Sequence, residues 1–206
     1  MDNVEIRSFE FEVRAEENEE HGHYLTGQPI VYGERTNLGW CDEIIDYDAL
    51  AETDLRDVRF LVNNKTDMIP LARSRNNNAN STMQMEVAED KGMFIRVDLD
   101  TENNADARSL YSAVERGDIS GMSFMFRVDK ELWEDIDSDH PTRRVQSIKK
   151  VFEVSAVTFP AYEATSIQAR GLSDALESAK ASLESARAEQ RKIEVEKLKI
   201  KLLSRS

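Results

Sequence analysis

Hydrophobic and polar residues alternate in several short stretches of this chain, which is the pattern of strands with one buried face. In the first stretch, Phe9, Phe11 and Val13 are separated by glutamates. Further strands are predicted over 24–32, 83–87, 94–99, 119–128 and 147–159. Turn-forming residues at 89–92 join two of these segments and predict a β-hairpin there.

Residues 105–116 follow a helical period instead, with one apolar face made of Ala107, Leu110, Tyr111 and Val114. Gly117 suits the C-cap of that helix, and a second, short helix is predicted over 46–53. The pattern therefore predicts an α+β body with a mainly antiparallel β core that is flanked by helices.

Composition changes sharply at Gly171, because all eight glycines and all four prolines lie at or before it. Residues 172–206 are mostly good helix formers and predict a long C-terminal helix, with Ser173 as a plausible N-cap. The helix carries a heptad seam of Leu176, Ala179, Leu183, Ala186, Gln190 and Ile193. We expect a body over 1–171 and a helical tail over 172–206, which either self-associates as a coiled coil or docks on a partner.

Charge narrows the possible partners. The chain has 27 basic and 40 acidic residues, a formal charge of −13. The tail is slightly basic, so the body carries the whole acidic excess. Such a field repels a phosphate backbone, so we expect no general nucleic-acid binding. The chain contains no run of 18 apolar residues, the length needed to span a membrane. Its acidic first residues lack the apolar core of a secretory signal. We expect a soluble, intracellular-type protein.

The segment 117–126 is the first that could hold reactive chemistry. As a strand it places Met122, Phe124 and Phe126 on one face, the obvious core face. Ser123 points the opposite way, and Gly121 two residues earlier lets another group approach it. Periodicity alone makes Ser123 a serine on the polar side of an amphipathic strand.

The segment 151–161 places an acid in an apolar strand. Phe152, Val154 and Ala156 share one face, and the other holds Val151, Glu153, Ser155 and Val157. Both faces carry bulky apolar groups, so we expect burial on both sides. A buried carboxylate needs a partner. Glu153 is therefore either in a salt bridge with an Arg or Lys, or it orients a catalytic base.

Three segments in order resemble the tailed-phage prohead proteases, capsid-maturation serine proteases whose fold is related to the herpesvirus assemblins. They are an apolar stretch that leads through Asn-Asn-Lys to an Ala-Arg pair (61–73), Ser-Gly-Met-Ser-Phe-Met-Phe (120–126) and Glu-Val-Ser-Ala-Val-Thr-Phe-Pro-Ala (153–161). The resemblance spans about 6–170. It implies an assemblin-like fold and a Ser–His–acid site without metal or organic cofactor.

By motif position Ser123 is the nucleophile and Glu153 the acid that orients the base. The histidine should fall within 63–65, where the closest match is Asn64. A carboxamide cannot take the serine proton near neutral pH, so we expect this chain to be inactive or strongly impaired. The asparagine is either an introduced knock-out or the mark of a naturally inactive homologue. We expect His21, His23 and His140 to be solvated loop residues, and Lys65 lies in a polar loop that gives no reason for a depressed pKa.

Two function classes follow. The first is a serine endopeptidase that cleaves the scaffold region or arm of the major capsid protein, and itself, inside the assembling procapsid in the host cytoplasm. The second is a non-catalytic assembly or scaffolding protein that binds coat protein, or another copy of itself, through its tail. The acidic clusters lack the spacing of a calcium loop, and Cys41 is expected to be a semi-buried thiol with no base beside it.

Overall fold

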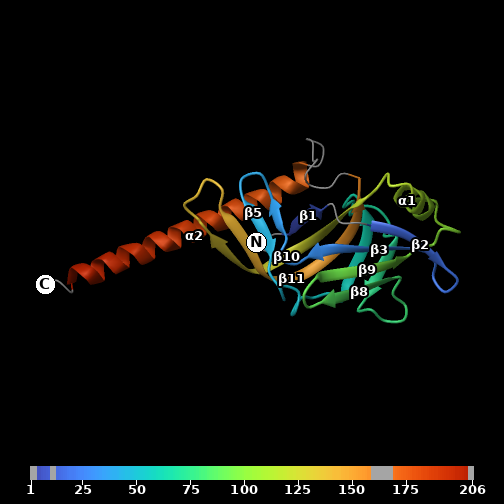
Figure 1. Cartoon of the computed structure of the whole chain (residues 1–206), viewed down its shortest axis with the longest axis horizontal. Coiled ribbons are helices and arrows are strands. Elements are labelled where there is room, and N and C mark those ends of the chain that lie inside the picture. Colours follow the sequence, from blue (N-terminus) through green and yellow to red (C-terminus); the bar gives the residue numbers. More distant parts are fainter. Residues whose placement is uncertain (1–3, 10–12, 159–168, 204–206) are drawn as a thin grey trace.

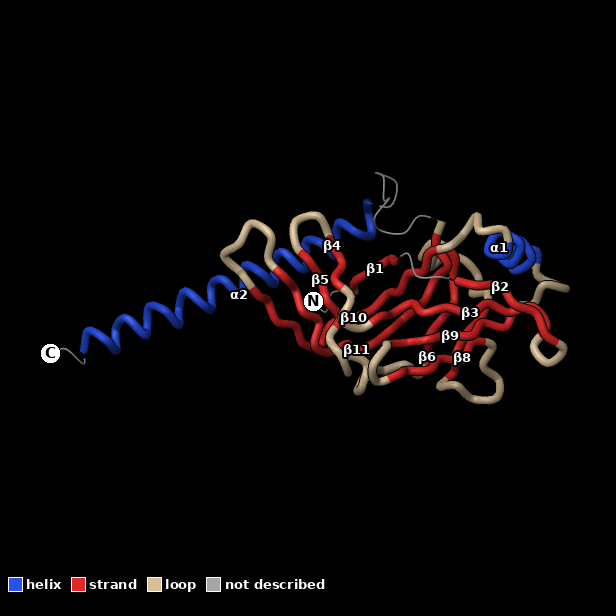
Figure 2. Tube along the Cα trace, viewed as in Figure 1, coloured by secondary structure: helices blue, strands red, loops and turns tan. Residues whose placement is uncertain are grey.

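Strands dominate the computed structural model, which describes residues 4–9, 13–158 and 169–203 (Figure 2). Within these residues the elements are β1 (Glu5–Phe9), β2 (Val13–Asn18), β3 (Gly22–Val31), β4 (Arg35–Asn37), β5 (Asp42–Ile45), β6 (Asp57–Val62), β7 (Ala72–Arg75), β8 (Met83–Ala88), β9 (Gly92–Asp98), α1 (Ala105–Glu115), β10 (Gly121–Glu134), β11 (Thr142–Val157) and α2 (Ala169–Leu203). The expected α+β class with a long C-terminal helix is confirmed.

A long hairpin of β10 and β11 organises the larger sheet (Figure 1). This seven-stranded sheet runs β1-β10-β11-β5-β4, and β6 and β7 join it through β11. β11 is long enough to have two different neighbours on its far side. Its first residues pair with β5 and its last with β6, both in parallel. The end of β6 therefore lies beside the end of β11.

The smaller sheet has the order β2-β3-β9-β8 and is antiparallel throughout its described pairings. It contains the hairpin predicted around 89–92. Gly92 stands at φ +114, and a Cβ added there would meet the Ile30 carbonyl oxygen at 2.1 Å. Only glycine fits this close approach between β9 and β3.

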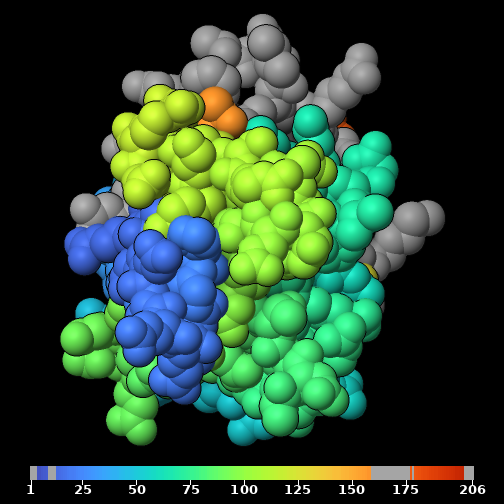
Figure 3. All heavy atoms as spheres, turned by 90° about the vertical axis from the view of Figure 1, so that its right-hand side faces the viewer, coloured from blue at the N-terminus to red at the C-terminus, as the bar shows by residue number. Residues whose placement is uncertain are grey.

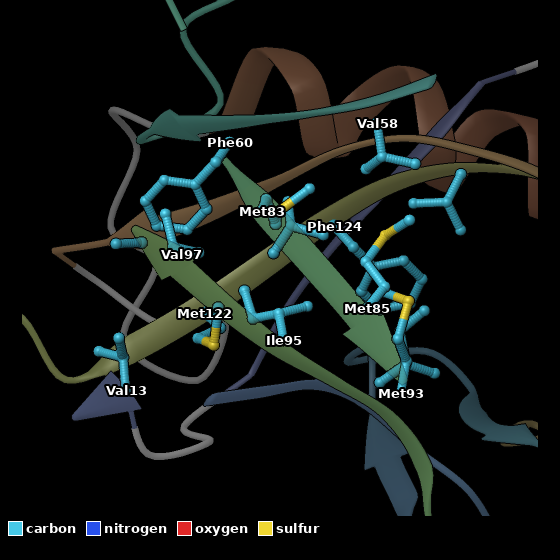
Figure 4. Close-up of a cluster of buried hydrophobic side chains, with 14 of the residues drawn as sticks. Val13, Val58, Phe60, Met83, Met85, Met93, Ile95, Val97, Met122 and Phe124 are labelled. Carbon is cyan, nitrogen blue, oxygen red and sulfur yellow. The ribbon is translucent and has the colours of Figure 1, made fainter. Parts of the chain in front are cut away.

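The core lies between the two sheets (Figure 4). Met83, Met93 and Val97 from the smaller sheet meet Phe60, Met122 and Phe124 from the larger one, and all six are fully buried. α1 packs beside β2 at one end of the body, opposite the free end of α2 (Figures 1 and 3). Of the four residues predicted on its apolar face, Ala107, Leu110 and Val114 are buried and Tyr111 is partly buried against the core.

α2 packs its first half on the body, and its second half projects beyond it (Figure 1). Ala179 and Leu183 are buried against Cys41 and Trp133. The helix begins by Ala169, so Gly171 lies within it, and the predicted start at 172 with a Ser173 cap is wrong. One glycine costs a helix about 1 kcal/mol, which a helix of 35 residues tolerates.

Three other expectations on local structure are wrong. The stretch 9–13 is not one strand, because Phe9 ends β1 of the larger sheet and Val13 begins β2 of the smaller one; Phe11 lies outside the described residues. Residues 46–53 form turns instead of a helix. A bulge at Phe152 reverses the alternation in β11, so Val151 faces the core with Val154.

Candidate active site

The three predicted site residues come from three adjacent strands. Ser123 lies on β10 directly opposite Ser155 of β11, and Ser155 in turn pairs with Leu61 of β6. Glu153 stands two residues before Ser155 and so points to the same side of the sheet. Asn64 follows the end of β6. The parallel pairing of β6 with β11 thus brings this turn to the strand that holds the acid.

Their side chains meet. The Asn64 Nδ2 lies 2.8 Å from Ser123 Oγ and 2.6 Å from Glu153 Oε1. The Ser123 hydroxyl is also 3.1 Å from Asn64 Oδ1, to which it can donate. The amide therefore bridges the hydroxyl and the carboxylate, the place that the middle member of a serine–base–acid triad occupies.

Ser155 is a fourth member of this group of side chains, and the sequence pattern alone gave it no role. Its hydroxyl donates to Glu153 Oε2 at 2.6 Å and accepts the backbone N–H of Asn64 at 3.1 Å. The signal was present in the sequence, because two residues separated by one position on a strand share a face. What the sequence could not show is that β6 ends beside this face.

The turn that holds Asn64 has an unusual backbone. Asn63 and Asn64 both have positive φ, +52° and +53°, a region that asparagine enters more readily than most residues. The turn is tied to β11 by the Asn63 N–H, which donates to the Ala156 carbonyl at 2.9 Å, and by the Asn63 Oδ1, which accepts the Thr158 N–H at 2.9 Å. These bonds fix the position of the side chain at 64.

Burial dominates the electrostatics of the site. Ser123 and Ser155 have no exposed surface, and Glu153 is 2% exposed. Burial raises the pKa of Glu153 to about 7, although hydrogen bonds from Ser155 and Asn64 act to lower it. The alternative of a salt bridge is not seen, since no Lys or Arg of the described residues pairs with this carboxylate; its partners are a hydroxyl and an amide.

The arrangement can hold a serine and an acid in register, but an amide takes up no proton at neutral pH. The histidines contact other groups. His23 lies in β3, so it is not a loop residue as predicted, and its ring is 2.7 Å from the Thr101 hydroxyl. His140 contacts Asp42, and His21 packs edge-on against Tyr24. The Lys65 side chain is exposed to solvent.

Within the described part of the chain, the other reactive groups form no second centre. Cys41 is fully buried, more than the semi-buried thiol expected, and burial raises its pKa to about 12. Among the described residues no three His, Cys, Asp or Glu side chains converge as metal ligands would. None of the helices in the described part of the chain has the length and apolar character needed to cross a membrane.

The chain is similar to known proteins in both sequence and structure. The sequence profile of the caudovirus prohead serine protease family matches residues 9–180. The prohead protease of Enterobacteria phage HK97 is 33% identical over 93 residues, which are 45% of this chain and 40% of that protein, so the match spans less than half of that relative. The structure of the bacteriophage T4 capsid assembly protease covers 76% of this chain and 99% of its own, with 12% identity and a TM-score of 0.41.

Proposed function

Because the chain belongs to the caudovirus prohead serine protease family, we propose that it has the active site of a serine endopeptidase of capsid maturation. Ser123 attacks the scissile carbonyl, a base at position 64 takes its proton, and Glu153 orients that base and stabilises its charged form. The single observation that supports this assignment is the Asn64 amide, which lies within hydrogen-bond distance of both Ser123 and Glu153.

The same observation supports inactivity of the chain with Asn64. The serine keeps an acceptor, Asn64 Oδ1, but this atom cannot remove the proton as attack proceeds. Loss of such a base lowers kcat by about 10³ to 10⁶. Histidine is also among the residues that tolerate positive φ, so it can occupy this turn.

The proposed substrates are the scaffold region or arm of the major capsid protein and the chain itself, cleaved inside the procapsid in the host cytoplasm. We propose an assemblin-like protease body over 1–171 and a tail over 172–206 that recruits the chain to the assembling shell or to other copies. No nucleic acid, metal or organic cofactor has a role in this scheme. The distal tail supports a binding role, because Ile193, Leu198 and Ile200 are exposed.

The second candidate is a non-catalytic assembly or scaffolding protein. Asn64 favours it, and so does a groove between α2 and the β10–β11 hairpin, whose lining includes Leu132, Ala186 and Ile193. Leu132 and Ile193 are 46% and 45% exposed, so this groove presents apolar surface to a partner.

A small alkyl fluorophosphonate distinguishes the two candidates, because it reacts with a serine whose proton a neighbouring base removes. We expect Asn64→His to be phosphonylated at Ser123 at least about a hundredfold faster than the parent. The control is Asn64→His combined with Ser123→Ala, which should not react. Peptide mass mapping locates the adduct. Equal reactivity of Asn64→His and the parent, or an adduct on another residue, contradicts the protease assignment.

A further inference from the structure

We propose that Ser155 is a positioning residue that couples the acid of this site to the turn that presents the residue at 64. The inference deepens the proposed function and rests on it for its kinetic part. The hydroxyl makes two bonds at once: it donates to Glu153 Oε2 at 2.6 Å and accepts the Asn64 N–H at 3.1 Å. One atom thus fixes the carboxylate and the backbone of the neighbouring turn relative to each other.

The hydrogen bonds that Asn63 makes from this turn do not involve the carboxylate. The Asn63 N–H donates to the Ala156 carbonyl, and the Asn63 side chain makes two hydrogen bonds with Thr158, so these three bonds hold the turn to the end of β11 without contacting the carboxylate. Among the described residues, Ser155 joins the backbone of the turn to the acid through one side chain, beside the direct contact that the Asn64 side chain makes with Glu153.

Burial makes this contact difficult to replace. Ser155 has no exposed surface and Glu153 almost none, so water has little access if the hydroxyl is removed. Ser155→Ala would leave the Asn64 N–H and one carboxylate oxygen without a partner, and buried polar groups in that state are costly. The carboxylate would lose a donor that favours its charged form.

The charged groups on the neighbouring strands do not compensate. Arg59, the β6 register partner of Glu153, pairs with Asp57 at 3.3 Å. On β10 the register partner is Met125, and Arg127 lies over the Phe152 ring. Lys150 on β11 pairs with Asp54 at 3.0 Å. The hydroxyl of Ser155 and the side chain at 64 are therefore the groups that act against burial and lower the pKa of Glu153.

A chemical consequence follows for the enzyme with a histidine at 64. The acid must be ionised to stabilise the imidazolium that forms as the base takes the serine proton. Without Ser155 the pKa of Glu153 rises, so the ionised acid, and with it activity, appears at higher pH. The turn is also less well fixed, and a small misplacement of the base costs up to about a hundredfold in rate. Since Ser155 contacts no substrate in this scheme, kcat falls more than KM changes.

The first test needs no catalysis and uses the chain as it is. Glutamate side-chain ¹³C resonances are titrated by NMR, and Glu153→Gln identifies the signal of Glu153 by its loss. We expect Ser155→Ala to raise the pKa of Glu153 and Ser155→Thr, which keeps the hydroxyl, to restore it. If Ser155→Ala does not fold, Ser155→Cys, with its weaker donor, serves in its place and should raise the pKa as well. An unchanged pKa in the folded variant overturns the proposal.

Ser74 provides a matched control. It is also fully buried on a strand, and its hydroxyl accepts the backbone N–H of Asn77, a positive-φ asparagine, at 3.2 Å. Ser74→Ala therefore removes the same kind of bond to the same kind of turn outside the site. It should leave the pKa of Glu153 unchanged, and a shift equal to that of Ser155→Ala would mean that the effect is general loosening of the fold.

The second test uses the Asn64→His background and follows cleavage over pH. Ser155→Ala should lower kcat by about tenfold to a hundredfold, move the acid limb of the profile to higher pH and change KM little, while Ser155→Thr recovers most of kcat. A profile identical to that of Asn64→His alone contradicts the inference. If Asn64→His itself does not cleave, the proposed function fails, whereas the NMR titration still decides the role of Ser155.

Discussion

In the proposed site, Asn64 holds the central position with a side chain that makes the contacts of the base but cannot take up a proton at neutral pH. Its amide lies within 3 Å of both Ser123 and Glu153, so the geometry of a triad persists without a proton acceptor. The missing positive charge affects Glu153. In an active enzyme an imidazolium would compensate its charge, but here a neutral amide faces it, and burial raises its pKa to about 7.

This gives a prediction for stability. The folded pKa of Glu153 exceeds its ordinary value of 4.5, so the folded chain binds this proton more tightly than the unfolded chain, and stability falls as pH rises from about 4.5 to 7. Glu153→Gln removes the penalty. Above pH 7 the variant should be more stable by up to about 3 kcal/mol, and near pH 4.5 the two should be equal. Urea unfolding at pH 4.5 and 8 measures the difference; a variant less stable than the parent at pH 8 would refute it.

The sequence could predict which residues meet at the site, but not their burial. The motifs placed Ser123, Asn64 and Glu153 together, and periodicity placed Ser123 on a polar side. It is fully buried instead, and the Asn64 side chain from the turn after β6 lies 2.8 Å from its hydroxyl. Ser155 was noted only as a neighbour of Glu153 on the strand face. Its role depends on the pairing of β11 with β6, a contact between distant parts of the chain.

At the scale of elements, a buried ionic cluster joins strands that are far apart in the sequence. Arg7 of β1 and Arg143 of β11 contact Glu5 and Glu43 at 2.5 to 2.9 Å, and all four are 2% exposed. Burial raises the pKa of Glu43, but the two guanidinium charges outweigh it and hold that pKa below the ordinary value. A sequence pattern reads such residues as a solvated face, so this cluster could not be predicted.

The cluster continues to α2. Arg143 pairs with Glu131, which contacts the Ser182 hydroxyl of the helix, and that hydroxyl accepts the Trp133 Nε1–H at 2.8 Å. The heptad seam of α2 has two halves with different surroundings. Its first half, around Ala179 and Leu183, is buried against the body, whereas Ile193 is exposed. The first stretch of the helix packs on the chain's own body, so the two alternatives for the tail, self-association or docking on a partner, concern its exposed distal stretch.

Docking of α2 is testable with one buried and one exposed leucine. Leu183 is 4% exposed and Leu198 is 61% exposed. Leu183→Ala should cost about 2 to 4 kcal/mol, and Leu198→Ala should stay within about 0.5 kcal/mol. The chain has two tryptophans, and both Trp40 and Trp133 lie in this contact, so fluorescence during urea unfolding reports on it. Equal losses for the two variants would mean that α2 does not dock as described.

The wrong expectations about elements share a physical cause. Alternation over 9–13 is real, yet the chain passes from one sheet to the other between Phe9 and Val13. Local periodicity does not say which strand is the neighbour. The turns at 46–53 include Asp48 at φ +64, which no helix accommodates. Strand and helix identity was predictable wherever one face packs on one neighbour, as in α1 and the β8–β9 hairpin.

At the scale of the whole molecule, charge and shape separate a body from a tail. The acidic excess lies before residue 172, whereas 172–206 hold eight basic and six acidic residues. The distal half of α2 extends away from the body (Figure 1) and is exposed from Arg191 to Lys201. Such an exposed helix is available to a partner. Both proposed functions use this tail, but only the protease would cleave it off, so cleavage or retention of the tail distinguishes the two functions.

The most direct measurement is the intact mass of the chain over hours, for the parent, for Asn64→His, and for Asn64→His combined with Ser123→Ala. We predict that Asn64→His loses a fragment near the boundary between body and tail, whereas the other two stay at 23.5 kDa. If Asn64→His also stays whole, even with capsid protein and scaffold supplied, the account of a protease that lacks only its base is contradicted. Cleavage that persists after Ser123→Ala would contradict the assignment of the nucleophile.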